Sequence, residues 1–298
     1  MRKFITILTL AFICCTIFPV AAQAKQKTTY MDQTNITTWL WDAAKIKTQP
    51  EQIIRNLTDR KVDTLLLQVD AAVNTQAYRT FIGLAHASGI QVHALDGAPQ
   101  WAAAGGEALQ DTFLNWLTAY QSAASATEKF DGIHLDVEPY DLDNYESEQN
   151  QILTAYQTMM VRFEKQSAQA GLTFGIDIPF WFYGVLYDNQ YGKGNIAEWL
   201  CQHVKNIAIM AYRDTAEGAD GIISIAAKEM KLFQTYGVKG TIAVETGRLS
   251  AANDFVTFYE ESKAYMDGQL QTVYQQYQSH PAFAGIAIHY YDSWIQMK

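Results

Sequence analysis

The stretch Phe130-Asp131-Gly132-Ile133-His134-Leu135-Asp136-Val137-Glu138-Pro139-Tyr140 alternates apolar and polar residues from Ile133 onward. A period of two predicts a β-strand, because successive side chains of a strand point to opposite faces. The apolar residues would pack under helices, whereas His134, Asp136 and Glu138 would face the other side. Polar side chains inside a protein are costly to bury unless they bond one another or a ligand. This strand is therefore expected to border a functional site.

Seven similar segments occur along the chain, separated by stretches of helical periodicity. The eight predicted strands are 37–42, 62–70, 90–97, 132–140, 172–180, 206–214, 238–247 and 283–294. Predicted helices include 50–61, 107–124, 148–170 and 254–278. Eight strand-then-helix units in about 250 residues predict a single (β/α)8 TIM barrel. A doubly wound open sheet is the alternative, but Trp39 to Ala44 lacks the glycine-rich phosphate loop expected after its first strand.

The composition narrows the class of protein. The chain has 298 residues, 49% hydrophobic and 18% charged, as folded globular proteins do. The 31 acidic residues outnumber the 22 basic ones, and no basic stripe interrupts this excess. We therefore expect no nucleic-acid partner. Aromatic residues make up 13%, which favours a ligand with flat apolar faces.

The N-terminal residues predict export. Arg2 and Lys3 precede an apolar run over 4–20 and the sequence Ala22-Gln23-Ala24, the pattern of a signal peptide. We expect residues 1–24 to be removed, leaving a barrel domain over 25–298 that is secreted or periplasmic and makes no membrane contact. An uncleaved membrane anchor is the alternative. The mature chain would keep only Cys201, so no internal disulfide is possible, and we expect a monomer.

Active sites on TIM barrels lie at the carboxyl ends of the strands. Carboxylates lie at or near all eight predicted ends: Asp42, Asp70, Asp96, Glu138, Asp177, Asp214, Glu245 and Asp292. Helix capping is an equally good explanation for Asp42, Asp70 and Asp214. The aromatic residues Trp101, Trp181 and Tyr183 are also expected near these ends. The predicted substrate-binding residues are His134, Tyr212, Arg213, Asp177, Asp96, Trp181, His289, Tyr291 and Trp294.

The fourth predicted strand resembles that of the family 18 glycoside hydrolases, the chitinase-like barrels, whose pattern is Asp-Gly-x-x-x-Asp-x-Glu. This chain has Asp131-Gly132, Asp136 and Glu138, with His134 where the full family pattern has another inward aspartate. The resemblance implies that Glu138 is the proton donor. It also implies that Asp136 orients an acetamido group of the substrate.

The sixth predicted strand carries a second resemblance to the same family, which has Met-x-Tyr followed by Asp or Asn. This chain has Met210-Ala211-Tyr212-Arg213-Asp214, so Arg213 displaces the acid by one position. The resemblance implies that Tyr212 assists the acetamido group.

Glu245 suggests a different mechanism. It ends the seventh predicted strand, and this arrangement resembles the large retaining clan of barrel glycosidases. There the acid/base glutamate ends strand four, often before proline as in Glu138-Pro139, and the nucleophilic glutamate ends strand seven. The asparagine of that clan is replaced here by Val137. Two carboxyl groups about 5 Å apart across the barrel would suit double displacement.

We predict a glycoside hydrolase that acts on an oligo- or polysaccharide without a cofactor. The predicted catalytic residues are Glu138, Asp136 and Glu245. An ionised Asp136 would keep Glu138 protonated by raising its pKa. The nucleophile is left open among water, Glu245 and a substrate acetamido group.

Two alternatives come from other classes. A metal-dependent hydrolase could use His93, His134 and His289, but the first strand lacks the His-x-His of amidohydrolase-like barrels. Moreover, His93 would point outward if Asp96 points inward. The second alternative is a carbohydrate-binding barrel without turnover, because His134 and Arg213 depart from the chitinase-like pattern.

Overall fold

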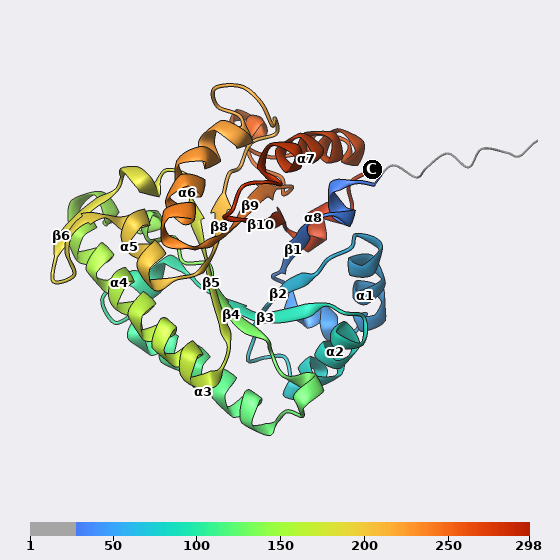
Figure 1. The fold of residues 1–298 in the computed structure, drawn as a ribbon. Coiled ribbons are helices and arrows are strands. Elements are labelled where there is room, and N and C mark those ends of the chain that lie inside the picture. The colour runs from blue at the N-terminus through green and yellow to red at the C-terminus, as the bar shows by residue number, and fades with distance from the viewer. Residues whose placement is uncertain (1–27) are drawn as a thin grey trace, which may run out of the picture.

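The computed structural model describes residues 28–298 and confirms the TIM barrel (Figure 1). The strands of the closed barrel are β1 (Asn35–Leu40), β2 (Thr64–Gln68), β3 (Gln91–Asp96), β4 (Gly132–Leu135), β5 (Thr173–Pro179), β8 (Asn206–Met210), β9 (Lys239–Glu245) and β10 (Phe283–His289). All neighbouring pairs are parallel. Thr37 of β1 lies opposite Ala287 of β10 and Thr64 of β2, which closes the ring. The predicted signal peptide lies outside the described residues.

Helices surround the strands in Figure 1. They are α1 (Pro50–Asp59), α2 (Thr75–Ala87), α3 (Glu107–Ala123), α4 (Tyr145–Ala170), α5 (Ile196–His203), α6 (Ile222–Tyr236), α7 (Lys263–Tyr277) and α8 (Tyr291–Trp294). α4 and α6 end at Gly171 and Gly237, whose φ angles of 68° and 66° suit the left-handed cap that glycine adopts easily. No helix among residues 28–298 combines the length and apolar character that a membrane span requires.

The interior of the barrel and the layer under the helices hold different side chains. The apolar residues of β4 and its extension, Ile133, Leu135 and Val137, belong to the large outer core, as the alternation predicts. Inside the barrel lies a small apolar cluster, made of Trp39, Leu66, Leu95, Ala243 and Ala287. The half-buried rings of Trp41, Tyr212 and Tyr290 pack against this cluster. They come from the carboxyl ends of β1, β8 and β10, the end that we call the mouth.

Several predicted elements are too long. β4 ends at Leu135 and β10 at His289, because beyond these residues the ladder to the neighbouring strands stops. Residues 291–294 form the short helix α8 and not the end of a strand. The predicted helix 254–278 begins only at Lys263, after a 3-10 turn over Ala251–Val256. The antiparallel hairpin of β6 (Leu186–Asn189) and β7 (Gly192–Asn195) was not predicted.

Candidate active site

The polar row predicted on β4 faces into the barrel and is joined by Asp177 of β5. Asp177 is only 2% exposed, and its Oδ2 accepts a hydrogen bond from Trp39 Nε1 at 3.1 Å. Its Oδ1 lies 3.0 Å from His134 Nε2, without the alignment of a hydrogen bond. Gly175 leaves room for the imidazole, because a Cβ there would lie 2.9 Å from His134 Nδ1. His134 is therefore held between neighbouring strands, and β5 supplies a carboxylate beside it.

Asp136 and Glu138 follow β4 at the mouth, and the pKa of each is raised above its usual value. Burial raises the pKa of Asp136 well above its usual range, and the charges of Asp177 and Glu138 raise it further. Its Oδ1 is buried and has no hydrogen-bond partner among residues 28–298. Burial also raises the pKa of Glu138, although the Tyr140 hydroxyl donates to Glu138 Oε2 and lowers it. The expectation that Asp136 is the ionised member is thus replaced by a pair in which Asp136 is strongly driven to keep a proton.

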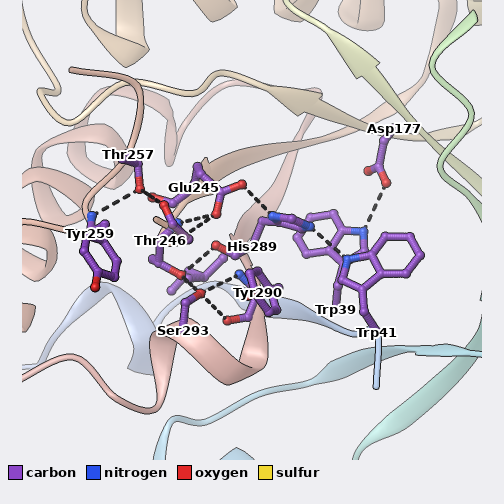
Figure 2. A network of polar contacts seen from close by, with 12 residues as sticks. Trp39, Trp41, Asp177, Glu245, Thr246, Thr257, Tyr259, His289, Tyr290 and Ser293 are labelled. Atoms are coloured by element: carbon purple, nitrogen blue, oxygen red, sulfur yellow. Dashed lines mark hydrogen bonds and ion pairs between the residues drawn. The ribbon is translucent and has the colours of Figure 1, made fainter. Parts of the chain in front are cut away.

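Glu245 lies at the end of β9 and is 6% exposed (Figure 2). Its Oε1 accepts hydrogen bonds from the backbone N–H of Thr246, at 2.7 Å, and of Gly247. Its Oε2 lies 2.7 Å from His289 Nδ1. The other ring nitrogen of His289, Nε2, lies 2.9 Å from Trp41 Nε1. Both carboxyl oxygens of Glu245 are therefore already engaged by the protein.

Tyr212 belongs to the same neighbourhood. Its ring stacks on His289 with centroids 6.1 Å apart and planes 26° apart. Burial, and then the charges of Glu245 and Asp136, raise the pKa of Tyr212 well above its usual range. The phenol therefore keeps its proton and can donate a hydrogen bond.

Comparison with known proteins supports the barrel fold. No family model and no curated protein matches the chain. Among solved structures, the chitinase from Chromobacterium violaceum is 9% identical, with a TM-score of 0.53 over 87% of this chain and 95% of that one. The GH18 chitinase from Cycas revoluta in complex with (GlcNAc)3 is 10% identical, with a TM-score of 0.52 over 88% and 96%. The spore cortex-lytic enzyme SleL of Bacillus megaterium is 11% identical, with a TM-score of 0.51 over 86% and 70%.

The chain has the fold of the GH18 chitinases. In this GH18-like barrel the three predicted catalytic residues lie in one electrostatic neighbourhood. The charges of Glu138 and Glu245 raise the pKa of Asp136, and all three residues raise the pKa of Tyr212. The charge of Asp177, which lies inside the barrel, also acts on Glu138. Among the predicted substrate-binding residues, the structure brings His134, Asp177, Tyr212 and His289 to this centre.

Two predicted residues of the GH18-like mouth lie elsewhere. Tyr291 and Trp294 were expected on the eighth strand, but they are in α8 and are buried in the outer core. The Tyr291 hydroxyl accepts a hydrogen bond from Asn56 of α1 at 2.8 Å, and the Arg60 guanidinium lies 5.4 Å from the ring centre of Trp294. Because the chain turns immediately after β10, both rings lie outside the strands, in the core beneath the helices.

The alternation of β3 is opposite to the one expected. Leu95 points into the barrel, so Asp96 lies on the outward side, where its charge acts on Tyr78 of α2. His93 is inward and lines, with His134, a polar cleft of about 340 Å³ at the end opposite the mouth. Burial lowers the pKa of His93 to about 4. In residues 28–298, no group of three or more His, Cys, Asp or Glu side chains is arranged to hold a metal ion.

The remaining predicted residues are occupied by protein contacts. Arg213 donates through Nε and Nη2 to both carboxylate oxygens of Asp220 at 2.9 Å, and through Nη1 to the Tyr212 carbonyl. Trp181 packs edge-on against Tyr140, with ring centres 4.8 Å apart.

One expected ring is absent from the mouth, and another ring there was missed. Trp101 is 4% exposed and packs in the outer core between Phe113 and Phe163. Trp41 lies at the mouth but was not predicted as a site residue. Its position two residues after the inward Trp39 could have identified it.

Proposed function

We propose that this protein is a glycoside hydrolase that cleaves next to an N-acetylated sugar, with Glu138 as proton donor. The observation that carries the proposal is the half-buried pair of Asp136 and Glu138 just beyond the carboxyl end of β4, both with raised pKa. Carboxyl groups tuned in this way suit general acid catalysis near neutral pH. The GH18-like fold supports the same reaction class.

The proposed reaction uses the substrate's own acetamido group. Glu138 transfers its proton to the glycosidic oxygen as the bond from that oxygen to the anomeric carbon breaks. The acetamido carbonyl oxygen forms the new bond to this carbon. Asp136 Oδ1, which lacks a partner in the described part of the chain, accepts a hydrogen bond from the acetamido N–H. Water then attacks the anomeric carbon, gives a proton to the Glu138 carboxylate, and opens the cyclic intermediate. The Tyr212 hydroxyl donates a hydrogen bond to the acetamido group.

Glu245 is a poor nucleophile in this arrangement. One of its oxygens accepts two backbone hydrogen bonds and the other faces His289 Nδ1. Attack on a sugar would have to use the remaining lone pair of Oε2, whose nucleophilicity the hydrogen bond from His289 reduces. We therefore favour the acetamido group over Glu245 among the three nucleophiles that the sequence leaves open.

The test compares the purified mature chain with Glu138→Gln on chito-oligosaccharides and on matched oligosaccharides without N-acetyl groups. Cleavage of the acetylated series alone, inhibition by a thiazoline analogue and loss of turnover in Glu138→Gln are expected. A covalent adduct on Glu245 with an activated glycoside would instead establish double displacement. Equal cleavage of both series would refute the role of the acetamido group.

A carbohydrate-binding barrel without turnover is the second candidate. The hydrogen bond from Tyr140 to Glu138 favours it, because this contact occupies the proton donor. Binding of oligosaccharide by both the parent chain and Glu138→Gln, with cleavage by neither, would establish this function. Export guided by residues 1–24 is part of both proposals.

A further inference from the structure

The contacts of His289 fix which nitrogen carries its proton. An indole N–H is a donor only, so Trp41 Nε1 must donate to His289 Nε2 across their 2.9 Å contact. Nε2 is therefore unprotonated. The proton of the neutral imidazole is on Nδ1, which donates to Glu245 Oε2 at 2.7 Å. Figure 2 shows the imidazole between the carboxylate and the indole.

The backbone of the β9–α7 loop holds the other end of this relay, which we define as Glu245, His289 and Trp41. The two N–H groups that bind Glu245 Oε1 belong to Thr246 and Gly247. A Cβ at Gly247 would lie 2.9 Å from that same oxygen. Glu245 is thus fixed by the main chain, and it orients an imidazole that in turn holds an indole.

Trp41 is the relay member that reaches the mouth. It follows the end of β1 and is half-buried, and it packs against the inner cluster, as Tyr212 and Tyr290 also do. Its ring meets that of His289 at 71°, with centroids 6.3 Å apart. An aromatic ring kept in one orientation and partly open at the site of chemistry is suited to stack on the apolar face of a sugar.

We propose that Trp41 is a carbohydrate platform at the mouth of the barrel and that Glu245 and His289 are its positioning residues. This inference rests on the proposed function for its ligand. Glu245 itself does not touch the sugar: it orients His289, and His289 orients Trp41, which contacts the sugar. The relay also requires an unprotonated Nε2, since an imidazolium has no acceptor to offer the indole.

The experiment uses the full chain carrying Glu138→Gln, so that binding is measured without turnover. The probe is N-acetylchitotetraose, followed by calorimetry and tryptophan fluorescence. Trp41→Ala is expected to weaken binding about tenfold or more, which corresponds to roughly 1.4 kcal/mol. Trp41→Phe keeps a ring but loses the N–H, so a smaller loss is expected. Trp116→Ala, on α3 away from the mouth, is the matched control and should bind as the parent does.

Two further measurements separate positioning from simple packing. Trp41→Phe and His289→Asn each break the relay, so their combined effect on the dissociation constant should be no larger than the greater single effect. The nitrogen NMR spectrum of His289 should show a protonated Nδ1 and a bare Nε2 in the parent. Additive losses, or a proton on Nε2, would overturn the relay.

The outcomes distinguish this inference from the proposed function. If Glu138→Gln binds oligosaccharide and Trp41→Ala binds equally well, the platform is wrong and the hydrolase proposal stands. If Glu138→Gln and the parent chain bind no oligosaccharide, the proposed function and the platform both fail. Thermal melts of each variant, with Trp41→Phe as the conservative change, separate lost binding from lost folding.

Discussion

Gly97 offers a sharp test of how the carboxyl pair is positioned. It follows β3 with φ at 154°, a conformation that favours glycine. A Cβ at this position would overlap the carbonyl oxygen of Asp136 and lie 2.5 Å from its carbonyl carbon. The same two segments are joined by a hydrogen bond from the Asp136 N–H to the Asp96 carbonyl at 3.1 Å. Gly97→Ala therefore requires the backbone of Asp136 to move.

The size of the effect follows from two costs. Backbone strain at a positive φ costs about 1–3 kcal/mol, and forcing an extra methyl group into packed structure costs about 1–3 kcal/mol. The unfolding free energy should therefore fall by roughly 2–6 kcal/mol. For a domain of this size, that lowers the melting temperature by about 5–20 °C. A shift of Asp136 by about 1 Å would also reduce turnover about 100-fold.

Gly105→Ala is the matched control. Gly105 also has a positive φ, 82°, but a Cβ there would have no heavy atom within 4 Å. It should show only the backbone cost, about 1–2 kcal/mol. Both variants are melted by circular dichroism and assayed on chito-oligosaccharides well below the lower melting temperature. Equal loss of stability in the two variants, or full activity in Gly97→Ala, would refute the reasoning.

Three further substitutions test the site and its surroundings. Glu138→Gln should lower kcat about 10²–10⁴-fold. The melting temperature at pH 7 should not fall, because the substitution removes a carboxyl group whose pKa is raised by burial. A large loss of stability would contradict the assignment of Glu138 to a site that disfavours its charge. Burial raises the pKa of Asp96 to about 6, so the folded state binds more protons than the unfolded state between about pH 4 and 6, and stability falls as pH rises through that window. Asp96→Asn should remove this slope and add up to about 3 kcal/mol at pH 7, measured by urea unfolding at pH 4 and pH 7, and an unchanged slope would count against it. Trp294→Ala should cost about 3–5 kcal/mol of stability, since the ring is fully buried in the outer core. The oligosaccharide dissociation constant should be unchanged. Weaker binding by the folded variant would mean that Trp294 belongs to the binding site after all.

The barrel could be predicted because its signal is repeated and local. Each strand carries outward apolar residues at every second position, and eight such segments separated by helical stretches leave few alternatives. The ends of the strands could not be predicted in the same way. Asp136 and Glu138 continue the alternation of β4, yet the strand ends at Leu135. A strand persists only where its neighbours still pair with it, which local periodicity does not report.

The site was predictable only where one segment carries it. Asp136 and Glu138 are close in sequence, so the motif on β4 places both. The partners of the relay are distant: Trp41 and His289 are 248 residues apart. The contact of His134 with Asp177 likewise joins neighbouring strands. The inward side of β3 was assigned wrongly because Asp96 looked like a site residue, whereas packing places Leu95 inside.

The unpartnered oxygen of Asp136 links binding to acid catalysis in the proposed reaction. A buried acceptor without a donor is costly. In the free protein, protonation of the Asp136 carboxyl group reduces the cost of burying its charge, which is why burial raises its pKa. An acetamido N–H supplies the missing donor, and it bonds best to an ionised Asp136. Glu138, whose charge acts on Asp136 and whose own pKa is raised, is able to take the released proton. Binding of the acetamido group would thus load the proton donor, so ligands without this group should leave Glu138 less protonated and be cleaved slowly even when they bind.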